Sequence, residues 1–142
     1  MKANEVMIGD WVEPNQCKVP TTYTRVEMIM TDGVHMEEAE RQFDFEELHP
    51  IHVTKEILEA NGFIKSGYMC RCVYNLADFD NHAQLDYNLK FSTFEIKRMK
   101  NRGWTAKLYI EAQYVHELQH ALRLAGLSDL ADNFVIEKGG QQ

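Results

Sequence analysis

The chain has 142 residues, a length that fits one domain with a single sizeable core. Hydrophobic residues make up 44% of it and aromatic residues 11%, which excludes an intrinsically disordered protein. A formal net charge of −7 argues against wholesale binding of nucleic acid, and no apolar run approaches the roughly 20 residues of a membrane-spanning helix.

The N-terminal third predicts a small, bent antiparallel sheet. Residues 7–12 and 25–31 read as two short strands, and an Asp-Gly pair after the second suits a tight hairpin. Residues 34–47 are strongly acidic and predict a solvated loop or edge. Three large apolar side chains of this stretch and its end are expected to face inward: Phe43, Phe45 and Leu48.

The remainder predicts a short helix, an antiparallel meander and a final helix. Thr54 is a good N-cap for a helix over 55–60, which Asn61 and Gly62 end. Aromatic and aliphatic residues then alternate with polar ones over four segments, which predict the strands 68–76, 84–91, 94–99 and 105–112. An amphipathic helix is expected over 114–124, and residues 135–136 could add an edge strand.

We therefore expect a single α+β domain over residues 1–142. Its N-terminal bent β subregion covers residues 1–48. The subregion 49–142 holds the short central helix, the meander and a C-terminal amphipathic helix packed on the sheet.

The cysteine count bears on the compartment. Cys17, Cys70 and Cys72 are an odd number, which argues against a disulfide scaffold. Cys70 and Cys72 would share one face of a strand, too far apart for an easy bridge. The sequence therefore predicts reduced thiols and a cytoplasmic protein, and its opening residues turn acidic too early for a secretory signal.

One short motif carries a specific chemical hypothesis. The run His116-Glu117-Leu118-Gln119-His120 matches H-E-x-x-H, the helical motif of zinc proteases. Two histidines four residues apart on a helix can share a metal ion, and the glutamate between them can act as the base that activates a metal-bound water. The motif thus predicts a zinc-dependent hydrolase as an alternative function.

The surroundings of the motif favour a different interpretation. A helical wheel separates an apolar side from a side with the motif histidines and Arg123, so we expect that polar side to face water. The extended motif needs a glycine at position 123 and a histidine at position 126, where the chain has Arg123 and Gly126. Glu137 is left as a speculative third ligand beside His116 and His120, and two histidines alone would bind zinc weakly.

A third hypothesis concerns a short basic run with an aromatic residue, a combination that can contact a phosphate backbone or stack a base. Such runs are more often solvated hairpins, and the acidity of the chain agrees with that. The residues of this run are Lys97, Arg98, Lys100, Arg102 and Trp104.

Three stretches together resemble a known group of sequences. They are residues 1–12 with Ile8-Gly9-Asp10-Trp11-Val12, residues 49–63 with the Pro-Ile-His-Val-Thr run and the helix after it, and residues 114–126. In order and spacing they are similar to a family of small uncharacterised proteins of anaerobic gut bacteria, their phages and mobile elements. The resemblance covers about a third of the chain and implies no assigned activity.

The resemblance also bears on the motif and on location. In that family the positions that match Glu117 and His120 are often other residues, such as glutamine and asparagine, which implies that the zinc motif is a local accident. A phage-encoded member would work in the host cytoplasm. The leading expectation is thus a non-enzymatic accessory protein without a cofactor. It would bind a protein partner or another copy of itself, in preference to nucleic acid or membrane.

Overall fold

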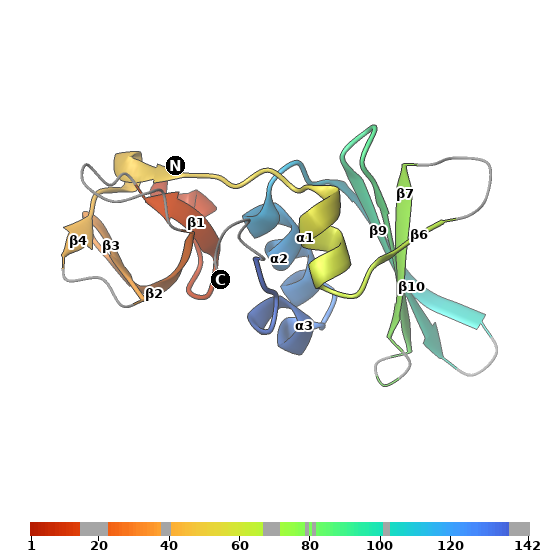
Figure 1. Cartoon of the computed structure of the whole chain (residues 1–142). Helices are drawn as coiled ribbons and strands as arrows, with labels where there is room; N and C mark the ends of the chain where they lie inside the picture. The colour runs from red at the N-terminus through yellow and green to blue at the C-terminus, as the bar shows by residue number, and fades with distance from the viewer. Residues whose placement is uncertain are drawn as a thin grey trace.

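The computed structural model describes residues 1–14, 23–37, 41–66, 72–78, 80, 82–100 and 103–136, except for the side chains of residues 100 and 103–106. It has a β-sheet at each end and three helices in the layer between them (Figure 1). Both sheets are antiparallel, which confirms the predicted α+β class. Among the described helices, none combines the length and apolar character needed to cross a bilayer.

The first sheet is built from the N-terminal part of the chain, in the order β4-β3-β2-β1-β5. Its strands are β1 (Trp11–Pro14), β2 (Thr24–Met30), β3 (Gly33–Met36), β4 (Gln42–Phe43) and β5 (Leu48–His49). Two short 3₁₀ turns accompany them, η1 (Ala3–Glu5) and η2 (Phe45–Glu47).

The acidic stretch 34–47, expected as a solvated loop or edge, contributes β3 and β4 to this sheet, and β4 is an edge strand. The acidic residues of the stretch all lie outside these two strands, and Val34 and Met36 of β3 are fully covered. Phe43 and Leu48 are buried as predicted, while Phe45 is half-buried against them. The acidic residues around these two short strands therefore made the strands hard to predict from the sequence.

The second sheet has the order β10-β9-β8-β7-β6 and includes the predicted four-stranded meander. Its strands are β6 (Ile64–Lys65), β7 (Val73–Asp78), β8 (Ala83–Asn88), β9 (Thr93–Lys100) and β10 (Gly103–Glu111). Strict alternation in β8 buries Ala83, Leu85 and Tyr87 and leaves the residues between them half-exposed. One face therefore packs on the helices, and the other forms an end of the molecule (Figure 1).

Three helices fill the space between the sheets: α1 (Lys55–Ala60), α2 (Val115–Leu124) and α3 (Ser128–Asp132). The predicted cap is confirmed, because Thr54 Oγ1 accepts a hydrogen bond of 3.2 Å from Ile57 N. Gly62, with a φ of 91°, ends α1. Residues 135–136 are not a strand, although Val135 is held by Asn61.

Buried apolar side chains form two clusters. One lies within residues 6–48, in the first sheet, and the other spans residues 51–136 between the helices and the second sheet. Leu118 and Leu122 of α2 belong to the second cluster, so the predicted packing of this helix on the meander is confirmed. The first sheet contacts α2 through buried polar groups, and Trp11 of β1 packs against the second cluster.

The expectation of reduced thiols is wrong for Cys72, which is disulfide-bonded. Cys17 and Cys70 lie outside the described residues. Because stable disulfides form in oxidising compartments, the cysteines give no support to a cytoplasmic location.

The packing of α2 on the second sheet can be tested with a pair of leucines on the same helix. Leu118→Ala should lower the free energy of unfolding by about 2 to 5 kcal/mol, because it removes a fully buried side chain and leaves a cavity. Leu124, with 79% of its surface exposed, is the matched control, and Leu124→Ala should change little. Urea unfolding followed by circular dichroism measures both, and equal effects would contradict the orientation of α2.

Candidate functional site

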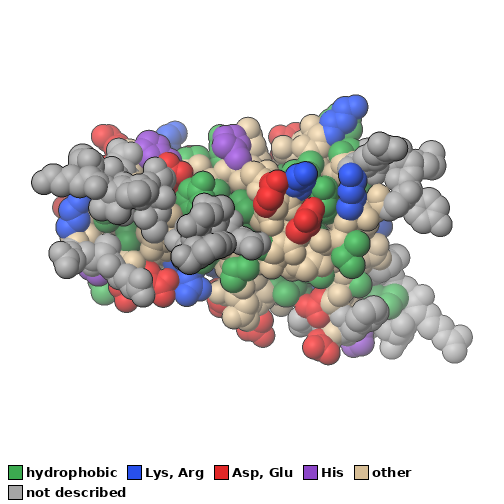
Figure 2. Space-filling view, viewed as in Figure 1, with side chains coloured by type: hydrophobic (Ala, Val, Ile, Leu, Met, Phe, Trp, Pro, Cys, Tyr) green, Lys and Arg blue, Asp and Glu red, His purple; other side chains and the backbone are tan. Residues whose placement is uncertain are grey.

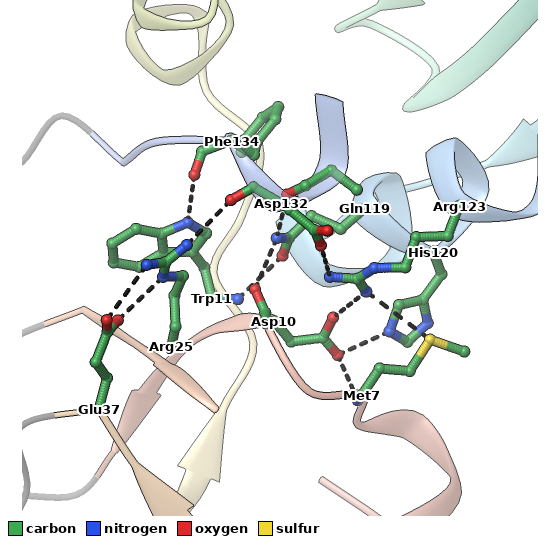
Figure 3. A network of polar contacts seen from close by, with 12 residues as sticks. Met7, Asp10, Trp11, Arg25, Glu37, Gln119, His120, Arg123, Asp132 and Phe134 are labelled. Atoms are coloured by element: carbon green, nitrogen blue, oxygen red, sulfur yellow. Dashed lines mark hydrogen bonds and ion pairs between the residues drawn. The ribbon is translucent and has the colours of Figure 1, made fainter. Parts of the chain in front are cut away.

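The H-E-x-x-H motif lies on α2, but its polar side does not face water. His116 is 7% exposed and Gln119 is completely buried. The side chain of His120 is 24% exposed and that of Arg123 17%. The expected solvent-facing orientation is therefore wrong: this side of α2 packs against the turn before β1 and against α3 (Figure 3).

The carboxylate of Asp10 is the centre of this interface and has no exposed surface. Its Oδ2 atom lies 2.7 Å from His120 Nε2 and accepts a hydrogen bond of 2.7 Å from Met7 N. Its Oδ1 atom accepts a hydrogen bond of 2.8 Å from Arg123 Nη1. A buried carboxylate is tolerated when its oxygens are paired in this way.

Gln119 connects α2 to two other elements through its side-chain amide. Its Oε1 atom accepts a hydrogen bond of 3.0 Å from Trp11 N, at the start of β1. Its Nε2 atom donates to Gly9 O at 3.0 Å and to Ala131 O of α3 at 3.1 Å. All three are backbone groups, so this one amide satisfies polar atoms that would otherwise be buried without partners.

The turn that carries Asp10 fits closely against α2 because of a glycine. Gly9 has a φ of 91°, a conformation that other residues rarely adopt. A Cβ atom at this position would lie 2.9 Å from Arg123 Nη2. The glycine therefore allows both the turn and the approach of the arginine to Asp10.

An outer ring of contacts closes the interface on the side of β2 (Figure 3). Trp11 Nε1 donates to Phe134 O at 2.6 Å, and Arg25 Nη1 donates to Asp132 O at 3.0 Å. The Arg25 guanidinium also pairs with Glu37 at 3.0 Å and lies 5.6 Å from the centre of the Trp11 ring. The segment after α3 is thereby attached to the first sheet.

Glu117, the base of the zinc hypothesis, has a structural role at the start of α2. Its Oε1 atom accepts hydrogen bonds from the backbone N–H groups of Gln113 and Tyr114, at 3.1 and 3.0 Å. This is the glutamate half of a capping box, which satisfies donors that the first helical turn leaves free. The carboxylate is thus directed at the backbone that precedes α2.

His116 lies in an aromatic stack and has one unused nitrogen. Its ring is parallel to that of Tyr114 at 5.9 Å and perpendicular to that of His120 at 5.5 Å. Its Nδ1 atom is buried and has no hydrogen-bond partner. Burial lowers the pKa of the His116 imidazole below its usual value of 6.5, and the carboxylate of Asp10 partly opposes this effect.

The positions of the zinc candidates can be compared with what zinc requires. Glu137 lies outside the described residues, and in the part of the chain that the structure describes no three His, Cys, Asp or Glu side chains are grouped to hold a metal ion. Asp10 is the carboxylate beside His120, but their 2.7 Å contact is a direct hydrogen bond. Two ligands of one tetrahedral zinc ion lie about 3.3 Å apart, so this pair would have to open to admit the ion.

The basic run is divided between two faces of the second sheet. Lys97 lies on the outer face, 3.2 Å from Glu95 and 4.0 Å from Asp86. Arg98 points to the helix side, where its Nη1 atom donates to Ala125 O at 2.8 Å. Arg102 and the side chains of Lys100 and Trp104 lie outside the described residues, so the nucleic-acid hypothesis stays a prediction for them.

A mostly apolar pocket of about 340 Å³ lies between the end of α1, the second sheet and α3. Its size suits a small ligand, but such sites also need polar groups that orient the ligand. The amide of Asn61 lines the pocket and is already bonded on both sides, to Ile57 O and to the backbone of Val135. We therefore assign no ligand to it.

Sequence reasoning missed Asp10 and Gln119, the two residues that organise the interface. The sequence places Asp10 within a predicted strand over 7–12, and Gln119 falls on an x position of H-E-x-x-H. The available signal was the resemblance, since residues 8–12 and 114–126 both carried it. The structure brings these two stretches together, and the bridge between His52 and Tyr114 adds the third.

Comparison of the chain with protein-family models, with curated proteins and with solved structures gives no match.

Removal of the Asp10 carboxylate tests how strongly the interface holds. Asp10→Ala should lower the free energy of unfolding by about 3 to 5 kcal/mol, because it leaves the largely buried Arg123 guanidinium without its closest partner. Asp132, 3.6 Å from the same guanidinium but 61% exposed, is the matched control. Asp132→Ala should cost at most about 1 kcal/mol in the same denaturant titration. A similar small loss in both variants would show that the pair is not important for stability.

The lowered pKa of His116 predicts a specific pH dependence. The unfolded chain binds a proton at this imidazole near pH 6.5, and the folded chain binds it only at lower pH. The folded state is therefore destabilised as the pH falls below about 6.5. His116→Phe keeps an aromatic ring beside Tyr114 and should reduce this loss, as measured by unfolding midpoints between about pH 5 and 7. All other titratable groups are common to both proteins, so identical pH profiles would refute the prediction.

Proposed function

We propose that this protein acts by binding another protein and not by catalysis, as an accessory protein of the kind that phages and mobile elements encode. The observation that carries the proposal is the use of the motif side chains within the chain itself. Glu117 caps α2, Gln119 joins three elements, and His120 lies on the buried Asp10. A stretch with these roles needs no catalytic function to explain it.

A hydrolase would need a different arrangement of the same groups. Its glutamate would have to reach a water on the metal, whereas Glu117 Oε1 accepts two backbone N–H groups. Its second histidine would have to direct a ring nitrogen at the ion, whereas the ring of His120 is oriented by the contact of its Nε2 atom with Asp10. Both groups would have to give up contacts that hold the fold.

Surface composition supports a protein partner. Large apolar side chains are exposed in several parts of the described chain, and such groups are typical of protein-binding surfaces when they cluster. They are Met7, Ile8, Met28 and Ile29 in the N-terminal part, Ile64, Met99 and Tyr109 in the second sheet, Phe91 in the turn before β9, and Leu124 and Val135 in the C-terminal part. The face in Figure 2 has acidic and basic side chains side by side, with no extended basic area among the described residues. Nucleic acid would require such an area.

The resemblance adds an independent argument. Its three stretches meet around the first turns of α2, where they fix the relation between the two sheets. In the resembling sequences Glu117 and His120 are often replaced, which a structural role tolerates and zinc chemistry does not. This supports a protein that acts by binding.

Zinc content and a glutamate variant test the proposal against the hydrolase. The protein purified without chelator should contain far less than one zinc per chain by elemental analysis, as should His116→Ala and His120→Ala. Glu117→Gln is the matched control, because glutamine also serves in a capping box and should leave stability almost unchanged. One zinc per chain that both histidine variants lose, with peptide hydrolysis that Glu117→Gln abolishes, would overturn the proposal.

A further inference from the structure

Among the described strands, the second sheet has one long edge without a partner. The outermost strands of the two sheets are β4, β5, β6 and β10. Three of them have two residues each, whereas β10 has nine and pairs only with β9 among the described strands. Short edges offer little to a partner, while a long edge presents a row of unpaired N–H and C=O groups.

The hydrogen bonds of β9 show which groups of β10 point away from the sheet. Ala112 N donates to Ser92 O, which lies directly opposite in the register of the pair. Residues that bond directly across an antiparallel ladder alternate, so Leu108 and Ile110 are bonded to β9. Met99 N donates to His82 O, which places the odd residues of β9 on β8 and agrees with this assignment. The N–H and C=O groups of residues 107, 109 and 111 therefore point outward.

The side chains of the same three residues lie on the outer face of the sheet. Lys107 and Tyr109 are 62% and 64% exposed, and Glu111 is exposed as well. Lys107 and Glu111 carry opposite charges at equal distances on either side of Tyr109. This arrangement is complementary to itself when the strand is reversed.

We propose that β10 pairs with β10 of a second copy of this chain, antiparallel, around a two-fold axis at Tyr109. In this register Lys107 lies opposite the partner's Glu111 and Tyr109 opposite the partner's Tyr109. Of the two-fold registers on this edge, only this one brings the lysine and the glutamate together. Opposite charges and aromatic pairs directly across a ladder stabilise it, and like charges destabilise it. The two sheets would join into one, a known mode of protein recognition.

The helix side of the edge has room for this partner. Leu108 and Ile110 point to that side and are only half-buried against the main cluster. The helices therefore do not cover β10 completely. An equivalent strand beside it would bury more of these two side chains on both copies, which favours association.

A lysine on an edge strand often serves to prevent pairing. Lys107 differs from a simple blocking charge, because the two-fold register supplies it with a carboxylate. It already lies 3.4 Å from Glu95 on the neighbouring strand, so it would be shared between two acids. The charge therefore selects one register and disfavours the others.

This inference deepens the proposed function by naming one partner, and the two can fail separately. A hydrolase with bound zinc could still pair along β10, and a monomer could still be a non-enzymatic binding protein.

Charge reversal tests the pairing through the mixing of two variants. Sedimentation equilibrium should show a dimer for the unaltered chain. Lys107→Glu and Glu111→Lys each put like charges opposite each other and should raise the dimer dissociation constant by about tenfold or more. In an equal mixture the two variants are complementary, so the heterodimer should form with a dissociation constant within about threefold of the original. An unfolded variant could not form the heterodimer, so circular dichroism of each variant on its own must show that it is folded.

A proline variant tests the edge itself. The N–H of Tyr109 points outward, so Tyr109→Pro removes no bond within the sheet but blocks pairing of the edge. The variant should be folded and monomeric. The proposal is overturned by an unaltered chain that stays monomeric at about 1 mM, the weak end of specific association. It is also overturned if Tyr109→Pro still forms the dimer. The same holds if the mixture of Lys107→Glu and Glu111→Lys has a dissociation constant no lower than that of each variant alone.

Discussion

The buried carboxylate of Asp10 is the constraint on which the arrangement of the two sheets depends. It joins the turn before β1 to α2 by contacts with Met7 N, His120 Nε2 and Arg123 Nη1, all between 2.7 and 2.8 Å. A charge without exposed surface is costly unless each oxygen is paired, so the three partners must be in place together. That requirement fixes how far β1 can move along α2, and Gln119 extends the same restriction to α3.

The helix α2 therefore makes contacts of a different kind on each of its two sides. Its apolar side packs on the second sheet in the larger cluster, and its polar side is bonded to the first sheet. A buried ion pair adds less stability than apolar packing of the same size, but it accepts few alternative geometries. We interpret the polar side as the element that specifies the position of the N-terminal sheet, and the apolar side as the main source of stability.

Local patterns in the sequence predicted most of the elements but not this interface. The cap at Thr54, the stop at Gly62 and the alternation in β8 depend on neighbouring residues, and the structure confirms them. The sequence does not predict β3 because the strand has only four residues and an acidic run follows it, although three of the four are buried. The polar side of α2 was placed in water because a helical wheel equates polar with exposed. Its partner, Asp10, lies 110 residues from His120, and no local pattern reveals such a pair.

The same spacing that defines a zinc motif also suits a polar helix interface. Residues four apart lie on one side of a helix, where two imidazoles can share an ion or line a carboxylate held by an arginine one turn further on. Here one of the two imidazoles, His120, contacts Asp10 together with Arg123, which lies three residues further along the same side of α2. Because these groups connect the two sheets, they are not available to bind a partner. The surfaces that remain available are the outer faces of the sheets and the edge of β10. A rigid connection between the sheets keeps these surfaces in a constant relation, and binding benefits because less conformational freedom is lost when a partner docks.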